Sequence, residues 1–455
     1  MIAQPSKYYQ LIPGGLAPVL TSLIEKADTS KIKGFDIDCL REVISIVASQ
    51  TRKDEAAAPL KSEYIAALVP QGDKYLRFLL DAGIVQRQGR FIPGELSYKY
   101  RFADAYQGAL ISGRLKSAKL AWRKDRVYRD LRKAAKKAIW GRSEQTTYLN
   151  KLTIADNFRE ALRGLKPGSD QYNSILASAV RIHNGEIFYS IDNTSGRFHS
   201  NITNLAKELR PYLRINGEPL CNIDIKNSQP YLSTIILTDP GKASTFTENA
   251  AFALLLQSLR VSLNEDVKKY IYLVASGSLY EYLMNEFAAK GLELTRSEVK
   301  TEVLRILFAR NRMPQEGAAR QARQIFRDCF PTVYKIFAKV RGAGRGDKFQ
   351  NFKRFPILLQ RIEAFLMLDI VLKRIYKELP GTIAVTVHDS VMTGILTNDV
   401  EAVRKIMTEE LTFFVGIRPQ IKIEGLEEEE REKRETSKHN HYDVTTSVNY
   451  DYSTS

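Results

Sequence analysis

The segment Val385-Thr386-Val387-His388-Asp389-Ser390-Val391 constrains this chain most, because it places an aspartate at the exposed bend between two β-rich runs. A second aspartate, Asp224, follows the run Cys221-Asn222-Ile223 about 165 residues earlier. Two carboxylates that each end an apolar strand can converge in space and hold a pair of divalent metal ions for phosphoryl transfer. The alternative is that each aspartate is a turn residue, whose side chain bonds its own backbone.

The composition is that of an ordinary globular protein with a basic surface. Its 455 residues are enough for two or three domains, and 44% of them are hydrophobic against 26% charged. The formal net charge of +16 favours a polyanionic partner, because such a surface attracts phosphate backbones over long range.

The cysteines and the N-terminus indicate where the protein works. Cys39, Cys221 and Cys329 are scattered and form no CxxC pair, which predicts a reducing compartment without a structural zinc or a disulfide framework. The N-terminus lacks the pattern of a signal peptide, and no run of 18 apolar residues occurs. We therefore expect a cytoplasmic protein with no membrane partner.

Residues 1–145 are expected to form a basic, mostly helical nucleic-acid-binding domain. Helical spacing predicts a helix from Asp73 to Ala82, and the runs Ile84–Arg87 and Arg90–Ile92, closed by Pro93, predict a β-hairpin. A helix followed by such a hairpin resembles a winged-helix unit, a common DNA-binding shape. A purely structural helical module is the alternative.

The stretch from Ile111 to Arg142 contains twelve Lys or Arg residues against two acids. No proline interrupts it, which predicts a long basic helix. These positive side chains repel one another unless a polyanion lies alongside them. We therefore expect Arg123, Arg126 and their neighbours to contact nucleic acid. A solvated surface helix is the alternative.

Residues 146–425 are expected to form the larger domain, with strands around the two aspartates and long helices between them. Its end is predicted to contain a helix from Asn398 to Leu411 and a strand from Arg418 to Ile423. Residues 426–455 form a charged and polar tail that has no apolar period and is expected to be disordered.

Two blocks of the larger domain carry residues suited to contact with phosphates and sugars. The first is Thr194-Ser195-Gly196-Arg197, followed by Asn204; its glycine permits a close approach, and its arginine is a forked donor. The second runs from Ile223 to Leu232 and places Gln229 five residues after Asp224.

The third block lies on an expected helix, where one face carries residues at a spacing of four: Arg296, Lys300, Leu304 and Phe308. A cationic pair beside apolar surface suits a nucleoside triphosphate, since the cations neutralise the departing pyrophosphate. The run from Pro356 to Gln360 follows, and His388-Asp389-Ser390 is the fourth block.

Taken in order, these blocks resemble the family A nucleic-acid polymerases, which include DNA polymerase I-like enzymes and single-subunit phage RNA polymerases. The resemblance covers roughly residues 190–425. It implies an α+β fold with an antiparallel palm sheet and helical fingers. Asp224 and Asp389 would be the metal ligands that hold two Mg²⁺ ions, with Mn²⁺ as the other candidate, and Lys300 would join them as a catalytic residue.

The resemblance also implies which residues bind the substrates. Arg296, Lys300, Leu304, Phe308 and Gln229 would bind the nucleoside triphosphate. Arg197, Asn204, Gln360 and His388 would contact the DNA template and primer. Ser195, Gln229 and Phe308 replace a Thr, a Glu and a Tyr of the family pattern.

The sequence thus predicts a nucleotidyltransferase, a DNA polymerase that adds deoxynucleotides to a 3′-OH in replication of a phage or mobile element. Gln229 is too bulky to welcome a 2′-OH, and Phe308 lacks the hydroxyl of the ribonucleotide-selecting Tyr. Ser390 instead favours an RNA polymerase or primase, because the phage RNA polymerases carry Ser at that position. A catalytically inactive DNA-binding replication protein is the third candidate.

Overall fold

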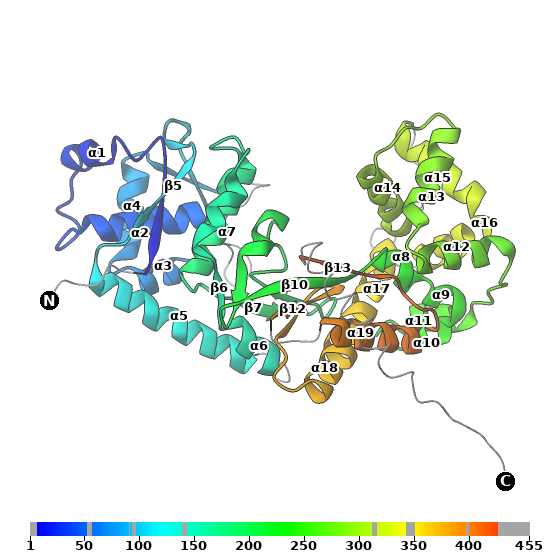
Figure 1. Ribbon diagram of the computed structural model, residues 1–455. Coiled ribbons are helices and arrows are strands. Elements are labelled where there is room, and N and C mark those ends of the chain that lie inside the picture. Colours follow the sequence, from blue (N-terminus) through cyan, green and yellow to red (C-terminus); the bar gives the residue numbers. More distant parts are fainter. Residues whose placement is uncertain are drawn as a thin grey trace, which may run out of the picture. The chain divides into compact units, whose positions relative to one another are not determined.

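The computed structural model describes residues 7–51, 57–90, 92, 97–138, 143–311, 316–342, 351–396 and 400–425. It is a mixed helix-and-sheet protein in which all paired strands of the described residues are antiparallel (Figure 1). The chain divides into unit 1, Met1–Asn193 with Phe198–Pro219, and unit 2, Thr194–Arg197 with Leu220–Ser455. This division differs from the boundary near residue 145 that the basic segment had suggested, because residues 146–193 pack with the N-terminal elements.

Unit 1 is built from short strands and seven α-helices within its described residues. The strands are β1 (Tyr9–Pro13), β2 (Ala58–Pro59), β3 (Val85–Gln88), β4 (Lys99–Phe102), β5 (Leu110–Arg114), β6 (Leu152–Ile154), β7 (Tyr189–Ile191), β8 (Phe198–Ser200) and β9 (Leu213–Ile215). The helices are α1 (Leu20–Lys26), α2 (Ile37–Gln50), α3 (Ser62–Leu68), α4 (Gly72–Asp81), α5 (Ala118–Ala138), α6 (Ser143–Leu149) and α7 (Asp170–His183).

Capping and side-chain hydrogen bonds organise the start of unit 1. The Asp36 side chain accepts from the backbone N–H of Asp38 and so caps α2. Strand β1 lies against α2 and α7: the backbone N–H of Leu11 donates to Ser45 Oγ at 2.9 Å, and that of Tyr9 donates to Asn184 Oδ1 at 2.8 Å. These bonds satisfy donors along an edge that β5 does not cover.

The elements of this part of the chain follow the order α2, β2, α3, α4, β3, β4, and the three strands are arranged in the order β2-β4-β3. Helix α4 confirms the helix predicted from Asp73 to Ala82 to within one residue at each end. The predicted hairpin was wrong: β3 pairs with Lys99–Phe102 and not with Arg90–Ile92, because the connection between the strands is longer than a tight turn. Phe91 and Pro93 lie outside the described residues.

The basic segment is shorter as a helix than the sequence suggested. Residues Leu110–Arg114 form β5, paired with β1, so the predicted start at Ile111 was wrong. Tertiary pairing overrides the helical pattern there, and α5 begins at Ala118. Residues 139–142, the predicted end, lie outside the described residues.

Unit 2 combines four paired strands with a large helical part. Its strand order is β11-β12-β10-β13, formed by Ala384–Val387, Ser390–Gly394, the larger part of Glu218–Ile225, and Ile421–Glu424. The first helices are α8 (Ser228–Ser233), α9 (Ile235–Thr238), α10 (Pro240–Ser244), α11 (Ala250–Ser258), α12 (Glu265–Ala275) and α13 (Leu279–Ala289). Next come α14 (Arg296–Phe308), α15 (Ala318–Cys329), α16 (Pro331–Arg341), α17 (Arg354–Ala364), α18 (Leu372–Glu378) and α19 (Val400–Val415).

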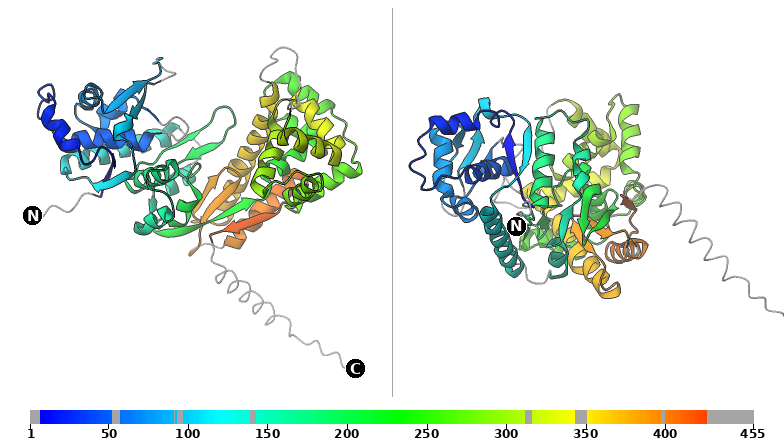
Figure 2. Two further views of the ribbon diagram at one scale, coloured as in Figure 1. Left: turned by 90° about the horizontal axis from the view of Figure 1, so that it is seen from above. Right: turned by 60° about the vertical axis from the view of Figure 1, so that its left-hand side comes forward.

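Figure 2 shows the helices α12 to α16 of unit 2 gathered into one group, drawn in green and yellow. Their shared core is rich in aromatic rings; Tyr270, for example, meets Phe326, Phe330 and Phe337 with ring centroids 5.4–6.2 Å apart. Helix α19 matches the predicted helix near 398–411, although Asn398 lies outside the described residues. The final strand begins at Ile421, later than the predicted Arg418.

A π-helical segment, Phe365–Val371, joins α17 to α18. The backbone stays helical through both junction residues, so residues 354–378 form one continuous helical rod. The tail 426–455, which the sequence predicts to be disordered, lies outside the described residues.

Candidate active site

The two aspartates singled out in the sequence lie on neighbouring strands of unit 2. Strand β10 pairs antiparallel with β12 so that Asp224 is directly opposite Ser390, the residue after Asp389. Asp389 and His388 form the two-residue turn between β11 and β12, and His388 has a positive φ of 57°. Both aspartates are half-buried. The expected convergence of the two strand ends is therefore found.

Ser390 stabilises the turn between β11 and β12. The Ser390 side chain is buried, and its Oγ donates a hydrogen bond to the backbone oxygen of Val387 at 3.0 Å. This bond holds the two strands together beside Asp389. The serine at this position therefore has a local structural role, which weakens its value as a guide to the sugar of the substrate.

Gln229 lies in the first turn of α8, just after the strand that carries Asp224. Asn227 takes a left-handed conformation, with φ 55°, and ends the strand, so that α8 begins at Ser228. The Gln229 Nε2 donates to Glu363 Oε2 at 2.5 Å. Its Oε1 is buried and has no hydrogen-bond partner within the described part of the chain. The amide is thus held by one end.

Glu363, on α17, is the residue that joins Gln229 to Arg197. The Arg197 guanidinium binds the Glu363 carboxylate through two hydrogen bonds, from Nε and Nη2, each 2.8 Å long. The Glu363 side chain is 2% exposed, whereas that of Arg197 is 19% exposed. Burial, and then repulsion from Asp389, raise the pKa of Glu363 to about 7, although Arg197 and Gln229 favour the carboxylate.

No sequence pattern points to Glu363. It lies in an amphipathic helix, where a single acid is ordinarily solvated, and its partner Arg197 is 166 residues away. The neighbouring Arg361 is bound to the same loop, since its Nε donates to the Thr194 backbone oxygen at 2.8 Å. Helix α17 therefore anchors the block that contains Gly196 and Arg197.

Helix α14 presents the third block as expected. A capping box between Thr295 and Glu298 fixes its first turn. Arg296 and Lys300 are exposed, and Leu304 and Phe308 are half-buried on the same face. The Arg296 Nε donates to Glu281 Oε1 at 2.6 Å, and its guanidinium lies 5.4 Å from the centre of the Tyr280 ring.

Tyr280 connects α14 electrostatically to the turn that holds Asp389. Burial is the main reason that the pKa of Tyr280 is raised well above its usual value. Arg296 opposes this shift, and Asp389 adds to it. The charges of Arg296 and Asp389 therefore both act on the Tyr280 hydroxyl.

The remaining predicted residues are divided between the units. Gln360 is half-buried on α17 of unit 2, whereas Asn204 is exposed in unit 1. Arg123 of α5 is occupied, because its Nε and Nη2 donate to the backbone oxygens of Ala67 and Ala66 at 2.7 and 2.8 Å. Arg126 is exposed and lies over the Trp122 ring.

The donors at the two aspartates suit Mg²⁺. Among the described residues, no group of three or more His, Cys, Asp or Glu side chains could hold a metal ion. Mg²⁺ does not require such a group, since it binds through one or two carboxylates together with water and substrate phosphates. Asp224 and Asp389 together supply that number of carboxylates.

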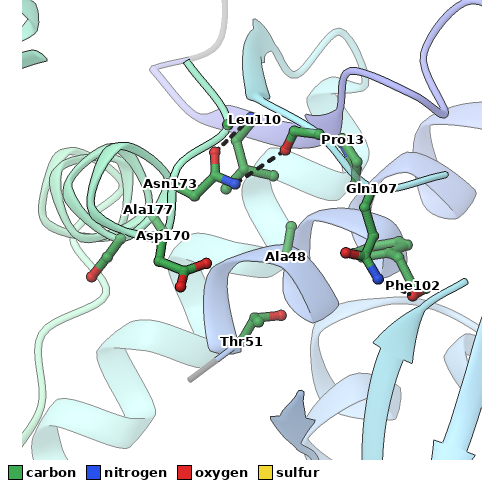
Figure 3. Close-up of a pocket in the computed structure, with 12 residues that line it drawn as sticks. Pro13, Ala48, Thr51, Phe102, Gln107, Leu110, Asp170, Asn173 and Ala177 are labelled. Carbon is green, nitrogen blue, oxygen red and sulfur yellow. Dashed lines mark hydrogen bonds between the residues drawn. The ribbon is translucent and has the colours of Figure 1, made fainter. Parts of the chain in front are cut away.

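A separate cavity of about 150 Å³ lies within unit 1 (Figure 3). Asn173 closes one side of it: its Oδ1 accepts from the Leu110 backbone N–H at 2.8 Å, and its Nδ2 donates to the Gly108 oxygen at 3.1 Å. Its other lining residues include Pro13, Ala48 and Phe102. None of the predicted site residues lines this cavity.

No protein-family model and no curated protein matches the sequence. Among solved structures, the chain is similar to the POL domain of Pol1 from M. smegmatis in complex with DNA primer-template and dNTP, with 12% identity and a TM-score of 0.30. The match covers 66% of this chain and 64% of that one, so the chain spans less than two thirds of the domain. A TM-score of this size does not establish a common fold. None of the described helices is long and apolar enough to cross a membrane.

Proposed function

We propose that the protein is a template-directed DNA polymerase, a nucleotidyltransferase that adds deoxynucleotides to a 3′-OH. The observation that carries this proposal is the register of β10 and β12, which places Asp224 opposite the neighbour of Asp389. Directly opposed residues have Cα atoms about 4.5–5.5 Å apart. Both carboxylates thus begin from adjacent backbone positions, as a shared metal site requires.

Asp224 and Asp389 would hold two Mg²⁺ ions, which when bound activate the attacking hydroxyl and stabilise the leaving pyrophosphate. Arg296 and Lys300 would bind the triphosphate. The ion pair between Arg296 and Glu281 joins half-exposed side chains, 54% and 46% exposed, so it is worth at most about 1 kcal/mol. A triphosphate can therefore displace Glu281 at little cost. Leu304 and Phe308 would offer apolar surface to the base.

Gln229 would exclude the 2′-OH of a ribonucleotide. Its hydrogen bond to Glu363 restricts the side chain, and a restrained group is a stronger steric barrier than a freely rotating one. Arg197 uses two of its five N–H donors on Glu363, which leaves others for the primer or template. Gln360 and His388 complete the proposed nucleic-acid contacts in unit 2.

Unit 1 would bind DNA through its winged-helix unit and α5. Helix α4 exposes Lys74 and Arg77, and β3 exposes Arg87, so cations face solvent on both parts of the winged helix. This arrangement fits the net charge of +16. We propose that this part of the chain holds template or origin DNA.

The test is an extension assay with Mg²⁺ that offers dNTPs or rNTPs, each with and without a primer. The proposal expects primer-dependent incorporation of dNTPs. A preference for rNTPs would favour the single-subunit RNA polymerase or primase. Absence of incorporation with either substrate, while DNA is still bound, would identify a catalytically inactive replication protein.

A further inference from the structure

The exposed face of α5 carries a regular row of cations together with a tryptophan. Helical spacing aligns six residues on this face, which we call the α5 stripe: Lys119, Trp122, Arg126, Arg129, Lys133 and Lys137. All six are exposed. The stripe extends for about 27 Å at 1.5 Å per residue. It therefore offers roughly one cation per helical turn.

The opposite face of α5 is committed to the core of unit 1. Leu120, Lys124 and Tyr128 are buried there, and Lys124 forms an ion pair with buried Glu42. Asp125 lies to one side, where it accepts hydrogen bonds from Lys7 and Tyr8. Asp130 is the acid that remains exposed beside the stripe. The orientation of the stripe toward solvent is thus fixed by packing.

Trp122 distinguishes the stripe from a generally basic surface. Trp122 is 61% exposed, which is unusual for a residue with so large an apolar side chain. The Arg126 guanidinium lies 5.2 Å from the ring centre. An exposed indole gains little from a DNA duplex, whose base faces are already stacked, but it can stack on an unpaired base.

We infer that the α5 stripe binds single-stranded nucleic acid, with Trp122 stacking on a base and the cations contacting successive phosphates. This inference rests on the proposed function only in taking nucleic acid as the partner. A stacking aromatic group beside a cationic track is the combination by which proteins hold single strands without reading their sequence. The stripe would hold the unpaired template strand.

Binding should be measured with the full chain and without nucleoside triphosphates, by anisotropy of a labelled thymidine oligonucleotide and of a duplex of equal length. Trp122→Ala should weaken single-strand binding about tenfold and change duplex binding less than twofold. Trp122→Phe should retain most of the affinity. Leu131→Ala is the matched control, because Leu131 is an exposed apolar residue on a different face of α5 and should have no effect.

Two further measurements separate stacking from charge. The chain has two tryptophans, so Trp140→Phe leaves Trp122 as the single tryptophan, and the oligonucleotide should quench the tryptophan emission. Arg129→Gln with Lys133→Gln should reduce the salt slope of single-strand binding by about 0.7 for each lost phosphate contact. Trp122→Ala should leave that slope unchanged.

Equal losses on single strands and duplex with Trp122→Ala, or absence of quenching, would overturn the inference. Because no nucleotide is added, these results are independent of polymerase activity. If the protein passes these tests but fails to extend a primer, the α5 stripe remains a single-strand binding site. Only the proposed polymerase activity is then refuted.

Discussion

Three carboxylates of unit 2 illustrate how environment assigns roles to one type of side chain. Asp224 and Asp389 are half-buried at strand ends, where solvent can reach them. Glu363 is almost fully buried and is occupied by Arg197 and Gln229. The first two are the proposed metal ligands, and the third holds its neighbours Arg197 and Gln229.

Asp224→Ala and Asp389→Ala should each abolish nucleotide incorporation and leave DNA binding nearly intact. Losing one carboxylate removes a metal ligand but none of the basic surface. Extension assays and DNA-binding titrations would measure the two effects. Asp328→Ala is the matched control, since Asp328 is a surface residue paired with Lys290 and should keep full activity. Wild-type synthesis by either site variant would remove the proposed active site.

Glu363 should make unit 2 less stable as the pH rises through 7. Its folded pKa of about 7 is above the usual value, so the folded state keeps a proton that the unfolded state has lost. The resulting stability is present in full below the unfolded pKa and is lost toward alkaline pH; from about pH 5.5 to 8 the loss is about 2 kcal/mol. Denaturant unfolding of the wild type and of Glu363→Gln, which has no such proton, would measure the difference. Parallel pH profiles for the two proteins would contradict this prediction.

Gln229→Gly should raise the use of rNTPs relative to dNTPs. Removing the side chain opens space beside the sugar, and specificity here depends on a steric clash. Competition between the two substrates in the extension assay gives the ratio. Glu363→Gln provides a useful comparison, because it loosens Gln229 without removing it and should shift the ratio less. An unchanged ratio in Gln229→Gly would place Gln229 away from the sugar.

At the scale of elements, α5 has one structural face and one free face, and the charged residues of its sequence are divided between them. Arg123 and Lys124 bind protein groups, whereas the stripe faces solvent. A count of charges along the sequence could not separate these groups, because the separation depends on the neighbouring α3 and α2.

Arg123→Ala should therefore destabilise unit 1 by about 1 kcal/mol, since it removes two hydrogen bonds from a charged donor to the end of α3 at a partly exposed site. The salt slope of nucleic-acid binding should stay as in the wild type. Arg129→Ala should leave the stability of unit 1 unchanged and reduce the salt slope of nucleic-acid binding. Thermal unfolding and salt titration of both variants would measure this. A reduced salt slope for Arg123→Ala would show instead that Arg123 contacts nucleic acid.

Local signals predicted the elements whose patterns are complete within a short stretch. The helical apolar period of α4 predicted that helix, and the β-rich runs around Asp224 and Asp389 predicted the paired strand ends. Strand β5 was missed because its partner β1 is about a hundred residues away. Glu363 was missed for the same reason, since only the folded chain brings Arg197 and Gln229 to it.

At the scale of the whole molecule, the chain divides into two compact units, and the proposed single-strand site on α5 lies entirely in unit 1. Residues 1–219 should fold alone, because the elements of unit 1 pack on each other and only four residues within that range, Thr194–Arg197, belong to unit 2. This fragment should unfold cooperatively and bind single strands with the wild-type salt slope, but should incorporate no nucleotide. Circular dichroism and binding titration would check it. A fragment that does not fold would show that unit 1 depends on unit 2.

The π-helical segment between α17 and α18 sets the rotational phase of the rod that carries Glu363. A π-helical stretch accommodates residues beyond the regular α-helical repeat, and each residue of an α-helix turns the chain by about 100°. Deleting one residue between Phe365 and Val371 would therefore leave the sequence of α17 unchanged. The deletion would rotate the face of α17 that carries Glu363 relative to α18. At one end of the rod Glu363 binds Arg197 and Gln229, and at the other end the Tyr376 hydroxyl of α18 donates to the Ala384 backbone oxygen of β11. The π-helical segment thus lets each end of the rod fit its own partners independently of the other end.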